Sequence, residues 1–126
     1  MLPLINARAD LLCFPSLYDN FGLVKVEAAA YKTAGVFIKN SCAGYGVTDG
    51  VNGYLSENTT QQFAEKIIRA LSDRENLKKV GENASRDLYI SWSDCADLLL
   101  KRLYEIVKEH KEKQQLINVS TSKIEK

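Results

Sequence analysis

The chain has 126 residues, 45% of them apolar, which fits one domain with a modest core. Its 17 basic residues nearly balance 16 acidic ones, so no net field would attract nucleic acid or an anionic membrane. The three cysteines form no Cys-x-x-Cys pair, and an odd number cannot complete a disulfide framework, which favours a reducing cytoplasm.

The first half of the chain alternates between short apolar segments and one alanine-rich segment. Residues 10–16 contain a continuous apolar run, Leu11 to Pro15, typical of a strand buried on both faces. Residues 23–32 carry apolar side chains at helical spacing, and residues 35–39 predict a second strand. After a glycine-rich loop over residues 40–53, residues 53–56 predict a third short strand. This alternation predicts a parallel sheet with right-handed crossovers.

The chain downstream of this sheet predicts a series of helices. Thr59 or Thr60 can cap one that ends near residues 72–73, and residues 77–88 predict another. A last helix follows, capped by a serine.

That serine is Ser91 or Ser93, and the apolar periodicity of the last helix fades from about His110. Residues 111–126 are polar and repeat Lys and Gln, so we expect a disordered tail there. The predicted domain therefore spans residues 1–110.

The segment from Asp19 to Glu27, DNFGLVKVE, is the strongest candidate for a functional site, because it joins a predicted buried strand to a helix. Ligands of open α/β sheets bind at such carboxyl ends. Gly22 allows a tight turn whose free N–H groups could point at an anion such as phosphate. Those N–H groups belong to Phe21, Gly22, Leu23 and Val24. The two flanking carboxylates can accept hydrogen bonds from sugar hydroxyls. Equally, Asp19 can merely shape a turn and Glu27 merely complement the helix dipole.

Three ordered segments resemble the retaining glycosyltransferases of family 4, which have the GT-B fold of two Rossmann-like domains. These segments are residues 15–30, residues 48–55, and residues 63–71 with 91–93. The first is similar to the family's E-x7-E signature, with its acids at Asp19 and Glu27, and the second to its segment D-G-x-N-G-x-L. The resemblance extends from Asn6 to Val107 and agrees with the element order.

The resemblance implies an α/β fold: part of a Rossmann-like parallel sheet with flanking helices, the C-terminal half-domain of a GT-B enzyme. It implies transfer of a sugar from a nucleotide-sugar donor, with UDP-glucose favoured and with retention of configuration. Asp19 would contact the donor sugar and Glu27 the ribose, which makes these two the candidate catalytic residues. The donor-binding residues would be Asp19, Asn20, Phe21, Gly22, Leu23 and Glu27. No metal or other cofactor is expected, since the leaving diphosphate would be stabilised electrostatically and the chain has no D-x-D motif.

The sequence departs from the family pattern at the first acid, at Lys32 to Ala34 after the signature helix, where the family usually has Gly-x-Pro, and in the loop around Gly44 to Gly46. The first acid is Asp19 rather than Glu, one methylene shorter. The loop around Gly44 to Gly46 lacks the family's frequent Gly-x-Pro-Glu and is closer to lipid-glucosylating members. The sequence leaves the acceptor open, with a glycolipid or a polysaccharide as candidates, and the full protein is expected to be cytoplasmic, with peripheral membrane association as the alternative.

A complete enzyme of this kind would need an N-terminal GT-B domain as partner, so we interpret the chain as a fragment that is inactive alone. Its exposed sheet edge would allow self-association. The alternative is a non-catalytic interaction or assembly module that keeps the half-domain fold. A phosphoacceptor receiver domain fits less well, because the clustered acids it needs after its first strand are missing.

Overall fold

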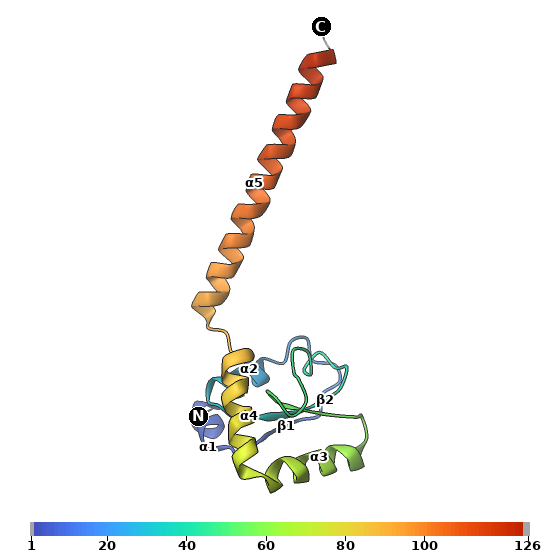
Figure 1. The fold of residues 1–126 in the computed structure, drawn as a ribbon, viewed down its shortest axis with the longest axis vertical. Helices are drawn as coiled ribbons and strands as arrows, with labels where there is room; N and C mark the ends of the chain where they lie inside the picture. The colour runs from blue at the N-terminus through green and yellow to red at the C-terminus, as the bar shows by residue number, and fades with distance from the viewer. Residues whose placement is uncertain (1, 125–126) are drawn as a thin grey trace. The chain divides into compact units, whose positions relative to one another are not determined.

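The computed structural model describes residues 2–124, with side-chain burial for residues 4–115. The chain divides into two compact units, Met1–Tyr89 and Ile90–Lys126, each considered by itself. The elements of the first unit are α1 (Leu2–Arg8), β1 (Leu12–Phe14), α2 (Leu23–Ala30), β2 (Gly35–Ile38), β3 (Tyr54–Ser56), α3 (Thr60–Ser72) and α4 (Arg74–Asp87). Helix α5 (Trp92–Ile124) forms the second unit (Figure 1).

The three strands form a parallel sheet in the order β1-β2-β3, which confirms the predicted α/β fold. Every residue of β2 is buried, because this strand has a neighbour on each side and helices pack around it. The expectation that residues 10–16 are buried on both faces is wrong: β1 is an edge strand, and its central Cys13 is exposed. A strand with one neighbour leaves part of its surface to solvent.

The core lies between the sheet and the helices that follow it. Val36 of β2 and Tyr54 of β3 pack with Leu77 and Val80 of α4, and α3 adds Ala70 and the partly buried Phe63. In the view of Figure 1, the strands lie between α2 above and α3 below. Helix α4 also packs on α2.

Capping side chains set the helix boundaries. Thr59 caps α3 by accepting the N–H of Gln62 at 3.3 Å, as predicted. Helix α4 begins at Arg74, three residues before the predicted start, because Asp73 accepts the N–H of Asn76 at 2.9 Å. The sequence pattern predicts Asp73 only at the end of the preceding helix. In the structure it serves both helices, as C-cap of α3 and N-cap of α4.

Gly81 allows α4 to pack closely on the turn after α2. A Cβ atom at this position would overlap the carbonyl oxygen of Lys32 and would lie 3.4 Å from the backbone nitrogen of Ala34. Lys32 itself has a left-handed backbone with φ 61°. The absence of a side chain at Gly81 therefore fixes how α4 packs on the chain between α2 and β2.

Helix α5 begins where the sequence predicts, since Ser91 accepts the N–H of Asp94 at 3.1 Å. It continues through residues 111–124, where the sequence analysis expects a disordered tail. Residues 111–115, Lys-Glu-Lys-Gln-Gln, have high helix propensity, which favours continuation of the helix there. Residues 125–126 lie outside the described part. Among residues 2–124, no helix combines the length and apolar character that crossing a membrane requires.

Candidate functional site

The Asp19–Gly22 turn lies between the carboxyl end of β1 and the start of α2, as predicted. Gly22 adopts a left-handed backbone with φ 69° and ψ 52° and is the N-cap of α2. Its amide donates to Asp19 Oδ1 at 3.0 Å, and the amide of Phe21 donates to the same oxygen at 3.2 Å. Asp19 therefore shapes this turn with one carboxylate oxygen.

This arrangement corrects the expectation of four free N–H groups. The amides of Phe21 and Gly22 are occupied by Asp19, whose short side chain reaches the N–H groups two and three residues ahead. The amides of Leu23 and Val24 make no hydrogen bond within the described part of the chain. They are the first N–H groups of α2, where the helix dipole favours negative charge.

The remaining predicted residues lie at the surface around this turn. The side chains of Phe21 and Leu23 are 56% and 55% exposed, and Asn20 is exposed as well. Glu27 is exposed one turn further along α2 and has no hydrogen bond or ion pair among the described residues. The structure thus places the predicted donor-binding residues on one chain segment at the surface, in which Gly22 itself is buried, and the two acids share no hydrogen-bond partner among the described residues.

Lys25 is a residue that the sequence analysis did not identify. It is only 6% exposed, and its Nζ donates to the carbonyl oxygens of Ala43 at 2.9 Å and Tyr45 at 2.6 Å. Burial lowers the pKa of its ammonium group, and the nearby Asp19 carboxylate partly opposes this by raising the pKa. A sequence signal was present, because a lysine in the first turn of α2 opposes the helix dipole.

The loop that accepts these bonds, residues 41–47, packs directly against the turn. A Cβ atom at Gly22 would lie 3.2 Å from Ala43 Cα, so the two backbones are in close contact. Ser41 Oγ holds the start of the loop, donating to the carbonyl of Ile38 at 2.7 Å and accepting the N–H of Gly44 at 3.0 Å. The departure from the family pattern around Gly44 to Gly46 thus concerns a segment in contact with the candidate site.

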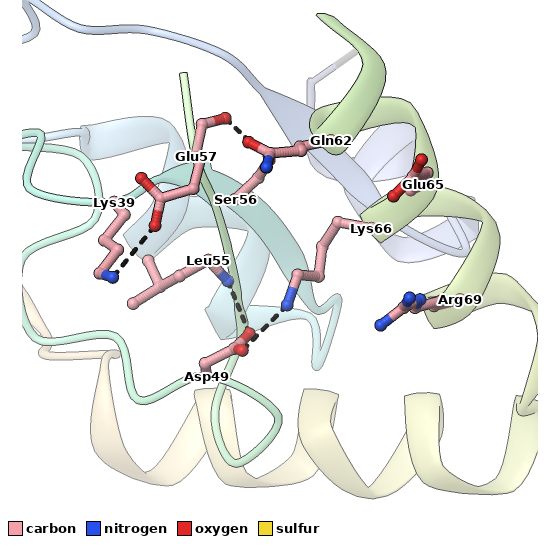
Figure 2. A pocket seen from close by; sticks show the side chains of 9 residues that line it. All are labelled: Lys39, Asp49, Leu55, Ser56, Glu57, Gln62, Glu65, Lys66 and Arg69. Atoms are coloured by element: carbon pink, nitrogen blue, oxygen red, sulfur yellow. Dashed lines mark hydrogen bonds and ion pairs between the residues drawn. The ribbon is translucent and has the colours of Figure 1, made fainter. Parts of the chain in front are cut away.

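A pocket of about 390 Å3 lies elsewhere, between β3, α3 and the loops beside them (Figure 2). Figure 2 shows Lys39 paired with Glu57 at 3.0 Å and Lys66 paired with Asp49 at 2.9 Å. The second oxygen of Asp49 accepts the N–H of Leu55 at 2.8 Å. Most charges of this pocket are therefore satisfied by one another, and none of the predicted donor-binding residues lines it.

No group of three His, Cys, Asp or Glu side chains that could hold a metal ion occurs within the described residues. Independence of metal stays a prediction. The chemistry available at the turn is that of two backbone amides and two carboxylates, which suits a ligand that bears both an anionic group and hydroxyl groups.

Comparisons with known proteins show the family and the fold of this chain. The family model described as "Glycosyl transferases group 1" matches residues 2–87. An uncharacterized glycosyltransferase of Methanocaldococcus jannaschii is 31% identical over 100 residues, which cover 78% of this chain and 28% of that protein. A D-inositol 3-phosphate glycosyltransferase of Nocardia farcinica is 33% identical over 99 residues, covering 77% of this chain and 22% of that protein.

A solved structure, Anabaena HepE in complex with UDP-glucose, superposes with a TM-score of 0.62 at 30% identity, covering 68% of this chain and 24% of that chain. This chain therefore spans about a quarter of the length of the proteins it resembles. Its three-stranded parallel sheet and flanking helices are part of a GT-B fold. The chain belongs to the group 1 glycosyl transferases.

Proposed function

We propose that this chain is the donor-binding part of a retaining glycosyltransferase that transfers a sugar from a nucleotide-sugar donor, with UDP-glucose favoured. The observation that carries the proposal is the left-handed Gly22 turn at the start of α2, where the amides of Leu23 and Val24 have no hydrogen-bond partner among the residues that the structure describes. The Anabaena neighbour, whose solved complex contains UDP-glucose, supports the choice of donor.

The proposed chemistry follows from charge. The leaving diphosphate gains negative charge as the sugar departs, and N–H groups at a helix N-terminus stabilise it without a metal. Asp19 Oδ2 has no hydrogen-bond partner in the described part of the chain and would accept a sugar hydroxyl. Glu27 would accept hydrogen bonds from the ribose. In this proposal the side chain of Asp19 has two functions, with one oxygen shaping the turn and the other binding the donor.

The rest of the enzyme lies outside this chain in the proposal. An N-terminal GT-B domain would bind the acceptor, a glycolipid or a polysaccharide, in a protein that is cytoplasmic or peripheral to the membrane. We propose that the isolated chain has no catalytic activity. The outer edge of β1 has no paired strand among the described residues and would allow self-association.

The test is an amide NMR titration of this chain with UDP-, GDP- and ADP-sugars, following residues 19–27. We expect shifts in this segment, largest for UDP-glucose, and weaker binding for Glu27→Gln. The matched control is Glu82→Gln, which changes an exposed acid on α4 and should bind like the unmodified chain. A folded sample in which none of these nucleotide sugars shifts the segment would refute donor binding and would favour a non-catalytic module.

A further inference from the structure

Lys25 is a buried cation in a helix that needs no cation to pack. The other buried residues of α2 are Ala28 and Ala29, which pack without polar groups. Removing an ammonium group from water is costly, and an apolar side chain of similar length would fill the space without that cost. The hydrogen bonds of Lys25 are therefore the feature that needs explaining.

Both hydrogen bonds go to one loop. The acceptors are the carbonyl oxygens of Ala43 and Tyr45, at 2.9 and 2.6 Å. These carbonyls lie within a series of tight turns, in which the N–H groups of Gly44 and Val47 bond to carbonyls three residues earlier, and neither carbonyl accepts one of these backbone bonds. Such turns leave carbonyl oxygens at their ends without backbone partners, and a cation is a strong donor for them.

The same loop contacts the donor turn. Ala43 packs against Gly22, and Lys25 lies three residues after Gly22 on α2. The ammonium group of Lys25 thus joins α2 to the loop close to Gly22, the residue with the left-handed backbone. A displacement of residues 43–45 would remove the packing that supports the conformation of Gly22 and, with it, the direction of the amides that follow.

We propose that Lys25 is a positioning residue that locks loop 41–47 against the Asp19–Gly22 turn and so holds the turn in the conformation that binds the donor. The proposal rests on the proposed function of that turn. Lys25 acts here through the loop and the backbone, without contact with the donor. The loop that departs from the family pattern is, in this view, kept in place by a side chain inside the signature segment.

The test compares Lys25→Met with Lys79→Met, which removes an exposed lysine of α4. In Lys25→Met we expect amide hydrogen exchange of Gly44 and Val47 to rise by at least about 10-fold, since each hydrogen bond from a charged group is worth about that factor. Amides of α3 should keep their rates. UDP-glucose should bind at least about 5-fold more weakly to the folded fraction, because part of the binding energy would be spent on ordering the loop. Lys79→Met should match the unmodified chain in all three measurements.

Unchanged loop exchange, or unchanged UDP-glucose affinity with faster loop exchange, would overturn the proposal. Uniformly faster exchange throughout the first unit would also overturn it, because it would show a purely structural role. If Lys25→Met does not fold, the proposal is tested on the unmodified chain by the exchange of the Lys25 Nζ protons with water, measured by 15N-resolved NMR. The Lys25 Nζ protons should exchange more slowly than those of the exposed lysines. Equal exchange rates would refute the proposed hydrogen bonding of Lys25 to the loop. If the unmodified chain binds no nucleotide sugar, the proposed function fails, and the loop exchange rates separately decide whether Lys25 holds the loop.

Discussion

Replacing Gly22 with alanine tests whether the left-handed turn is required for both folding and donor binding. The chain contains a control, because Gly50 also has a positive φ, 71° against 69° at Gly22. A Cβ atom at Gly50 would have no heavy atom within 4 Å, whereas one at Gly22 would lie 3.2 Å from Ala43 Cα. The two variants therefore share the backbone penalty and differ in the contact with the loop.

The magnitudes follow from these geometries. A left-handed non-glycine residue costs about 1–2 kcal/mol, so Gly50→Ala should lower the free energy of unfolding by about that amount. Gly22→Ala adds a tight contact with backbone, and crowding of this kind costs a further 1–3 kcal/mol, roughly. We expect Gly22→Ala to be the more destabilising of the two by about 1 kcal/mol or more.

The assay is urea unfolding followed by the amide NMR signals of β2, which report on the first unit alone. The single tryptophan, Trp92, lies in α5 and would report on the second unit. UDP-glucose titration of both folded variants completes the experiment: Gly50→Ala should bind like the unmodified chain and Gly22→Ala should lose most of its affinity. Equal unfolding free energies for the two variants, together with equal affinities, would refute the structural role assigned to Gly22.

Three further predictions concern other parts of the first unit. Gly81→Ala should lower the free energy of unfolding by about 1–3 kcal/mol despite the better helix propensity of alanine, because the added Cβ would overlap the Lys32 carbonyl oxygen. Urea unfolding measures this change, and a stabilised variant would contradict the packing of α4. Asp19→Asn should preserve the turn, since the amide oxygen of Asn also accepts hydrogen bonds from N–H groups. Because the negative charge is lost, UDP-glucose binding should weaken by about 1 kcal/mol, or about 5-fold. An unchanged dissociation constant in an NMR titration would exclude a role of the carboxylate in donor binding. Burial raises the pKa of Tyr54 above its ordinary value of about 10, so its stabilising contribution is complete below that pH and is lost as pH rises through the higher folded-state pKa. Urea midpoints between about pH 9 and 12 should therefore fall more steeply for the unmodified chain than for Tyr54→Phe, and parallel curves would show that Tyr54 does not contribute.

Several features of the fold were predictable from local sequence. The apolar runs that became β1, β2 and β3 lie within the predicted ranges, and Thr59 and Ser91 cap helices as expected. The start of α4 was not predictable, because Asp73 caps one helix while ending another. Local patterns indicate where elements form, since capping and periodicity depend on residues a few positions apart.

Burial depends on residues far apart in the chain, and here the sequence was less informative. The apolar run of β1 has the composition of a buried strand, but its position at the sheet edge exposes Cys13. For Lys25, the partners lie 18 and 20 residues away, in a loop whose path no periodicity predicts. Tertiary packing alone decided that this lysine is buried.

The sequence by itself determined the order of strands and helices, the position of the Asp19–Glu27 segment and the family to which the chain belongs. These follow from the types of neighbouring residues and from their spacing. Only the tertiary structure decided that Asp19 uses one oxygen to hold the amides of Phe21 and Gly22, and that Lys25 joins α2 to the loop at Ala43. The physical reason is that a hydrogen bond requires a donor and an acceptor to meet in space, and composition and spacing leave open which pairs do so.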